Sequence, residues 1–99
     1  MHHAIRAGSV EYLLVHIGDR LDNVTALLPL SPTFSVYAPD DTPKQTDVAA
    51  ETDGMTAKCL VDTTAGGVWP SNRYRLYLKL NAGSETPILG PVEFNVEEL

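Results

Sequence analysis

The sequence predicts an all-β fold, a β-sandwich or a small barrel, in a single domain. Apolar residues recur mainly at every second position, which is the period of a strand with one buried face. About five to seven strand-like segments follow one another at intervals of about 8–12 residues, as in sandwiches and barrels. Seven glycines and seven prolines suit short elements joined by tight turns. No segment has a convincing helical period.

Composition narrows the class of protein. The 99 residues are enough for one modest core, and the apolar share of 43% with a charged share of 20% is typical of a soluble globular chain. Thirteen acidic against seven basic residues give a net charge of −6, which argues against a general nucleic-acid binder. No apolar run is long enough to cross a membrane, and the opening residues contain no signal core. The single cysteine excludes an internal disulfide and fits a reducing cytosol.

The first predicted strand covers residues 9–17. Leu13, Val15 and Ile17 lie on one face, and Tyr12 and Leu14 lie on the other. We expect both faces to be partly covered. Residues 18–23 have turn composition, and 24–32 are expected to form an irregular connection with buried leucines because two prolines limit any helix there.

The second clear strand is predicted at 33–38, with three inward residues: Phe34, Val36 and Ala38. Residues 39–45 are expected to be a turn-rich loop, and 46–51 a short edge strand. Asp53-Gly54 favours a tight turn. After this turn four residues share one parity and form a predicted core stripe: Met55, Ala57, Cys59 and Val61.

Residues 63–72 are expected to form a loop or a single helical turn that leads into the strand "RYRLYLKL" (73–80). This strand has one apolar face: Tyr74, Leu76, Leu78 and Leu80. Its other face is basic, and we expect Arg73, Arg75 and Lys79 to pair with Glu93 and Glu97 across a terminal hairpin. The last strand should bury Val92, Phe94 and Val96, with prolines 87 and 91 near its start, where a missing N–H is tolerated.

Each candidate for chemistry has a plainer structural interpretation that we favour. His2, His3 and His16 lack the spacing of a metal site, and "DDTPKQTD" lacks the alternating oxygens of a calcium loop. Cys59 shares parity with apolar residues, so a small buried side chain is favoured over a nucleophile. "TAGGVWP" lacks the lysine and spacing of a phosphate loop, and Trp69 is predicted to plug the core rather than anchor an interface. No catalytic, cofactor-binding or metal-binding residue is predicted.

One family resemblance covers residues 8–97. Asp53-Gly54, Trp69-Pro70, the strand of Tyr74-Leu76-Leu78 and the terminal "GPVEFNV" resemble the framework of small immunoglobulin-like β-sandwich domains in virion proteins of tailed bacteriophages. "GDRL" and "FSVY" in the first half are also similar to such domains. Ser71-Asn72 replace the usual glycine before the tyrosine strand, which departs from the pattern. The resemblance implies about six to seven antiparallel strands in one sandwich.

It also implies a non-enzymatic virion structural protein that docks on the capsid or at the head–tail connection through protein–protein contacts. Its partners would be other virion proteins, capsid or neck and tail subunits, in many copies, with assembly in the bacterial cytoplasm and no nucleic acid, membrane or cofactor involved. On this basis the chain divides into an N-terminal arm (1–8), the sandwich (9–97) and a C-terminal tail (98–99). The termini are the predicted interface: Met1, His2, His3, Ile5, Arg6, Glu97, Glu98 and Leu99.

Three other functions remain open from the sequence. A tail or baseplate adaptor, or a carbohydrate-binding or adhesion module, has the same predicted fold. A sugar site needs exposed aromatic residues, and the candidates are scattered in sequence: Tyr12, Tyr37, Tyr77 and Trp69. A small barrel that binds nucleic acid would use the basic face of residues 73–79 as its platform.

Overall fold

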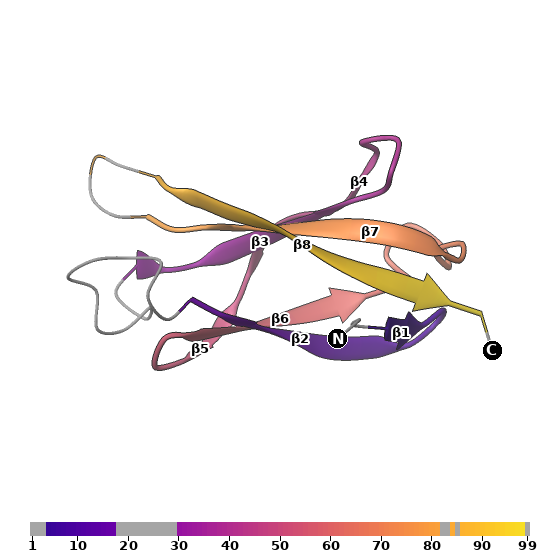
Figure 1. Ribbon diagram of the computed structural model, residues 1–99, viewed down its shortest axis with the longest axis horizontal. Helices are drawn as coiled ribbons and strands as arrows, with labels where there is room; N and C mark the ends of the chain where they lie inside the picture. Colours follow the sequence, from indigo (N-terminus) through magenta and orange to yellow (C-terminus); the bar gives the residue numbers. More distant parts are fainter. Residues whose placement is uncertain (1–3, 18–29, 82–83, 85, 99) are drawn as a thin grey trace.

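The structure is a computed structural model that describes residues 4–17, 30–81, 84 and 86–98, and these residues form eight strands in two layers (Figure 1). The strands are β1 (Ala4–Arg6), β2 (Val10–His16), β3 (Thr33–Tyr37), β4 (Pro43–Ala49), β5 (Glu51–Asp53), β6 (Thr56–Asp62), β7 (Asn72–Lys79) and β8 (Ile88–Glu97). The predicted all-β, two-sheet fold is confirmed. The predicted number of six to seven strands is too low.

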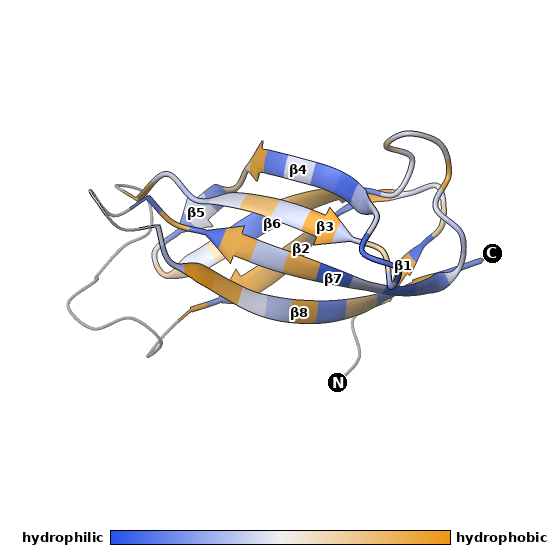
Figure 2. Ribbon diagram, turned by 90° about the horizontal axis from the view of Figure 1, so that it is seen from above, coloured by the Kyte–Doolittle hydropathy of each residue, from blue (hydrophilic) through white to orange (hydrophobic). Residues whose placement is uncertain are grey.

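The strands form two sheets. One has the order β1-β8-β7-β3-β4, and the other has the order β2-β6-β5. Figure 2 shows β4, β3, β7 and β8 side by side in the upper sheet. All pairs are antiparallel except β1 with β8, whose strands run parallel with Ala4 beside Asn95. The prediction that all strands pair in antiparallel orientation is therefore wrong for β1 and β8.

The core lies between the two sheets and follows the predicted period of two. All four residues of the apolar face of residues 73–80 are at most 1% exposed. Cys59 and its parity partners Ala57 and Val61 have no exposed area, and Met55 packs against the core. The other buried strand residues are Ile5, Leu13, Val15, Phe34, Val36, Phe94 and Val96. Alternation in the sequence thus predicted most of the core correctly.

Strand boundaries differ from prediction where prolines and turn residues dominate the composition. The loop expected at 39–45 ends early because β4 begins at Pro43, and an edge strand tolerates a proline at its first position. The predicted turn at Asp53-Gly54 is confirmed, with Gly54 at φ 59° between β5 and β6. The predicted connection at 18–29 lies outside the described residues, although Leu30 beside it packs against the core.

The link between β6 and β7 carries Trp69 into the core. Gly66 and Gly67 have φ of 76° and 112°, which only glycine adopts without strain, and the chain turns there. Trp69 is 1% exposed, and its indole Nε1 donates a hydrogen bond to the Ala65 carbonyl at 2.9 Å. Its ring lies 5.1 Å from that of Tyr74. The prediction that Trp69 plugs the core is confirmed.

Candidate functional site

Four of the predicted interface residues are described, and they lie on the edge strand β1 or at the end of its neighbour β8: Ile5, Arg6, Glu97 and Glu98. Arg6 and Glu97 are exposed and adjacent in register, and Glu98 is exposed just beyond β8. Ile5 is different, because it is 4% exposed and belongs to the core. Residues 4–6 of the predicted N-terminal arm (1–8) are therefore a strand of the five-stranded sheet. Met1, His2, His3 and Leu99 lie outside the described residues.

The basic face of β7 is neutralised by acids, but only one of its partners was predicted. Arg73 pairs with Glu93 at 3.5 Å, as expected across the hairpin. Arg75 pairs with Asp41, and Lys79 pairs with Asp47 at 3.3 Å. The prediction that Glu97 is a partner of this face is therefore wrong. The two aspartates come from the opposite flank of β7, beyond β3. The outer face of this sheet therefore presents balanced charge.

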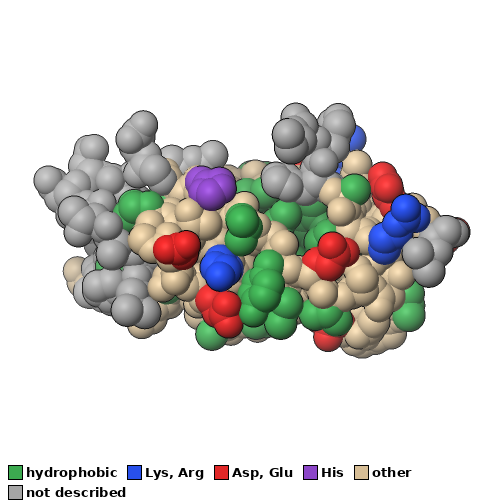
Figure 3. Space-filling view, turned by 90° about the horizontal axis from the view of Figure 1, so that it is seen from below, with side chains coloured by type: hydrophobic (Ala, Val, Ile, Leu, Met, Phe, Trp, Pro, Cys, Tyr) green, Lys and Arg blue, Asp and Glu red, His purple; other side chains and the backbone are tan. Residues whose placement is uncertain are grey.

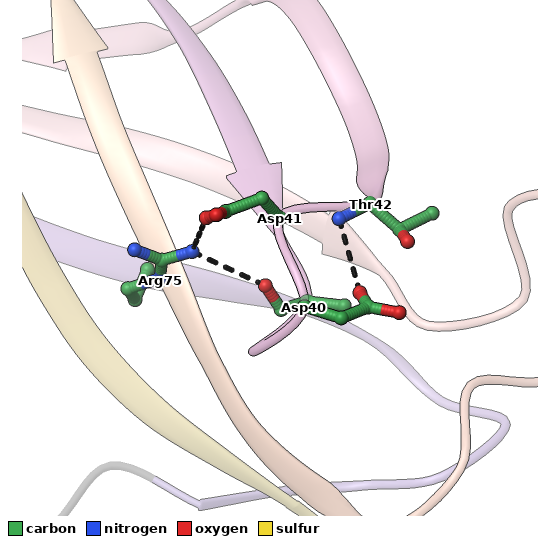
Figure 4. A network of polar contacts seen from close by, with 5 residues as sticks. Asp40, Asp41, Thr42 and Arg75 are labelled. Atoms are coloured by element: carbon green, nitrogen blue, oxygen red, sulfur yellow. Dashed lines mark hydrogen bonds and ion pairs between the residues drawn. The ribbon is translucent and has the colours of Figure 1, made fainter.

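Asp41 and Asp47 reach β7 because the chain bends sharply at each of them. Their φ angles of 69° and 48° are in the left-handed region, which aspartate tolerates better than most residues. Arg75 also donates to the Ala38 carbonyl at 3.3 Å, and Asp40 accepts the Thr42 N–H at 3.1 Å (Figure 4). Hydrogen bonding by Asp41 raises the pKa of Arg75, and hydrogen bonding by Thr42 lowers the pKa of Asp40. Asp40 and Asp41 therefore stabilise the β3–β4 turn, the first within the turn and the second against β7.

An open hollow of about 630 Å³ lies on the same outer face. Tyr37 and Tyr77 meet edge to face beside it, with ring centroids 5.8 Å apart. Its lining includes Ser35, Tyr37, Asp41, Thr46, Asp47, Arg75, Tyr77, Lys79 and Ile88. Two tyrosines that are distant in sequence are thus brought together, whereas Trp69 is buried and Tyr12 lies on the other sheet.

The outer face of the three-stranded sheet carries an exposed apolar stripe, which we define as Val10, Tyr12, Leu14 and Leu60. These residues are 50%, 47%, 45% and 40% exposed, in that order. Tyr12 is directly opposite Leu60 in the β2–β6 register, and Lys58 Nζ lies 5.8 Å from the Tyr12 ring centroid. Figure 3 shows apolar side chains gathered in the middle of this face with charged ones around them.

The apolar stripe was missed by sequence reasoning. Tyr12 and Leu14 were expected to be partly covered, and they are exposed. Singly exposed apolar residues are ordinary on a protein surface, but a contiguous group is typical of an interaction site. The available signal was that β2 is apolar on both parities while residues 56, 58 and 62 opposite it on β6 are polar.

Two described candidates for covalent or metal chemistry, Cys59 and His16, have packing or hydrogen-bonding partners. Cys59 has no exposed area, and burial raises its pKa to about 12, so the thiol stays protonated near neutral pH. His16 Nδ1 is 2.8 Å from Thr56 Oγ1. Among the described residues, no three histidine, cysteine or acidic side chains gather as they would around a metal ion. No helix in that part of the chain has the length and hydropathy to cross a membrane.

Comparisons with models of protein families, with curated proteins and with solved structures find no match for this chain.

Proposed function

We propose that this chain is a non-enzymatic structural protein that works by binding other proteins. The apolar stripe is the observation that carries the proposal. Four large apolar side chains, each at least 40% exposed, stand together on one regular sheet face. Keeping such a group in water costs free energy that a partner's surface recovers, at about 25 cal/mol for each Å² buried.

We also propose an immunoglobulin-like topology, which two features support. If β2, β6 and β5 correspond to strands B, E and D, then β8, β7, β3 and β4 correspond to G, F, C and C′. Tyr74, near the start of β7, donates its hydroxyl to the Pro70 carbonyl at 2.7 Å, like the tyrosine corner of such domains. The chain differs from antibody domains because it has no cysteine pair and places its tryptophan in the β6–β7 link.

The resemblance of the sequence to virion domains supports a place in the particle of a tailed bacteriophage. The partners would be capsid, neck or tail subunits. The stripe is smaller than the roughly 800 Å² per partner of a standard interface, so one contact would be weak. Many copies in a symmetric particle would make weak contacts sufficient through multivalency. A tail or baseplate adaptor would use the same surface with fewer copies.

Quantitative mass spectrometry of purified virions tests this proposal. We expect the chain to be present at a fixed ratio to the major capsid protein. Hundreds of copies per particle would indicate the shell, and a dozen or fewer the neck or tail, on the order expected for such symmetric assemblies. Absence from virions would overturn the assignment to the particle.

Substitution of the stripe tests the binding surface. The double variant Tyr12→Ser with Leu14→Ser should fold and lose incorporation into particles. A matched control replaces two exposed apolar residues outside the stripe, Val68→Ser with Ile88→Ser, which are 65% and 63% exposed. The control should be incorporated normally. Normal incorporation of the stripe variant would overturn the role of this face.

A second candidate function, binding of carbohydrate, is favoured by the hollow beside Tyr37 and Tyr77. Aromatic rings, hydroxyls and charged groups that converge in one concavity are the usual contents of a small-ligand site. NMR titration with neutral oligosaccharides tests it, since binding should shift the Tyr37 and Tyr77 signals, and Tyr77→Ala should abolish the shift of the Tyr37 signals. A nucleic-acid role is less well supported, because Arg73, Arg75 and Lys79 each have an acidic partner.

A further inference from the structure

Three of the four sheet edges carry features that discourage pairing with another chain. The β4 edge begins with Pro43, contains Asp47 at a positive φ, and has two register shifts against β3. The β1 edge is three residues long, and so is the β5 edge. Short strands, prolines and bulges are the usual protection of exposed edges.

The edge of β6 beyond the end of β5 is protected by a side chain. The Gln45 amide accepts the Asp62 N–H at 3.2 Å and donates to the Leu60 carbonyl at 3.4 Å. A primary amide offers the same donor and acceptor as a strand's backbone. Gln45 therefore occupies hydrogen-bonding positions that a further strand residue would take.

The outer edge of β2 has none of these features. It is seven residues long, contains no proline, and keeps a continuous register with β6 from Val10 to His16. Within the described ranges no strand pairs with this edge. Its only fully charged side chain is Glu11, whose carboxylate accepts a hydrogen bond from the Ser9 hydroxyl at 2.7 Å.

The hydrogen bonds between β2 and β6 show which backbone groups of β2 point to the open edge of the sheet. Thr63 N–H donates to Ser9 O, and Ile17 N–H donates to Met55 O, so odd-numbered residues bond to β6. In an antiparallel pair the bonded residues alternate, and the even-numbered residues direct their N–H and C=O groups to the other side. These are Val10, Tyr12, Leu14 and His16. Three of them also form the apolar stripe.

We propose that a second copy of the chain pairs with this edge, β2 against β2 in antiparallel orientation, so that two three-stranded sheets form one continuous sheet. With the two-fold axis at Leu13, Tyr12 lies opposite Leu14 of the second copy, and Val10 lies opposite His16. All four outward-facing residues then have partners. The contact is isologous, as expected of a symmetric dimer.

Side-chain chemistry favours a second copy as the occupant. Each copy carries a net charge of −6, which opposes association. This register brings the copies together where three of the four outer-face side chains of β2 belong to the apolar stripe. Lys58 and Asp62, which are opposite Leu14 and Val10 in the β2–β6 register, lie one strand away from the contact. The axis also joins Tyr12, Leu14 and Leu60 of both copies into one apolar surface.

The proposal rests on the proposed role in protein binding, but it makes a separate claim about the backbone edge. A seven-residue edge buries far less than the roughly 1,600 Å² of a standard interface, so the dimer should be weak. Sedimentation velocity of the whole chain should show the dimer fraction rising between about 10 μM and 1 mM. A monomer throughout this range would overturn the proposal and leave the virion test standing.

Two variants distinguish pairing through the backbone edge from non-specific apolar association of the stripe. Leu14→Pro removes an outward N–H without removing a bond to β6, and should weaken dimerisation at least about tenfold. Leu60→Lys is the matched control, because it makes the same stripe more polar from a strand one position inside the edge. Its effect should be smaller. If Leu14→Pro does not fold by circular dichroism, Tyr12→Lys with Leu14→Lys places like charges opposite each other across the axis.

Residue-specific amide exchange identifies the mode of contact. In the concentrated sample, the amides of Val10, Tyr12, Leu14 and His16 should become protected. The amides of Glu11, Leu13 and Val15 should be protected in dilute and in concentrated samples alike, because they bond to β6. A dimer in which the even-numbered amides stay unprotected would pair by its sheet faces and would overturn the edge-pairing proposal.

Discussion

The hydroxyl of Thr63 donates a hydrogen bond to the Ser9 carbonyl at 2.7 Å and also accepts the Gly8 N–H at 2.9 Å. Among the described residues, Thr63 is the one polar or charged residue that is fully buried, with no exposed area. One side chain thus joins the β1–β2 turn to the end of β6. Because β1 belongs to one sheet and β2 to the other, this threonine stands where the chain crosses between layers.

Replacing Thr63 should destabilise the fold. Thr63→Val keeps the side-chain shape but leaves two part-buried backbone groups, Gly8 N–H and Ser9 C=O, without this partner, so we expect the free energy of unfolding to fall by about 1–2 kcal/mol. Urea denaturation measures it. Thr33→Val is the matched control, because Thr33 Oγ1 is buried without a hydrogen-bond partner. That variant should be neutral or more stable, and equal losses in the two variants would contradict this account.

The Tyr74 hydroxyl should contribute one hydrogen bond to stability. Tyr74→Phe retains the ring packed between Trp69 and Phe94 and removes only the bond to Pro70 O. We expect a loss of about 1 kcal/mol in the free energy of unfolding. Tyr37→Phe, in the neighbouring strand, should change stability less. A Tyr74→Phe variant as stable as the parent would show that the corner bond adds nothing.

Gln45 should protect the end of β6 from exchange. Gln45→Ala removes the acceptor from the Asp62 N–H, so that amide should exchange faster while the Cys59 amide, which bonds to β2, does not. Gln45→Glu provides a finer comparison, since it keeps an acceptor for Asp62 and loses the donor to Leu60. Unchanged Asp62 exchange in Gln45→Ala would mean that the amide does not occupy the edge in solution.

The Cys59 thiol should be unreactive in the folded protein. Burial raises its pKa from 9.0 to about 12. Its contribution to stability is therefore complete below about pH 9 and is lost as the pH rises towards 12, because the unfolded thiol ionises first. The free energy of unfolding should fall more steeply above pH 9 in the parent than in Cys59→Ala. Rapid labelling by a disulfide reagent under native conditions would contradict this.

Alternation in the sequence predicted which side of each strand is buried, but not what lies beyond the strand. Tyr74 and Leu76 were assigned correctly because their neighbours in sequence have the opposite polarity. The partners of Arg75 and Lys79 were not, since β7 is flanked by β8 on one side and by β3 with β4 on the other. Parity gives the face of a side chain, and it does not say which flank supplies the counter-ion.

The same limit explains why the exposed apolar stripe was missed. A strand that is apolar on both faces is expected to be covered on both, and β2 is covered on one. Whether a third layer exists depends on the whole topology, which local period does not reveal. The termini were predicted as the interface because short terminal arms often become ordered only against a neighbouring molecule. Ile5 instead lies in the core, because the parallel pairing with β8 holds it there.

That parallel pairing also constrains the order in which the two sheets can form. Ala4 belongs to the first of the eight described strands in chain order, and its partner Asn95 belongs to the last of them. The edge strand β1 therefore cannot join the five-stranded sheet until β8, which lies between β1 and β7, has been made. Contacts between residues so distant in sequence close slowly, because a long loop must first be ordered. The β2–β6 pair is complete much earlier, so the three-stranded sheet can assemble while the last strands are still being translated.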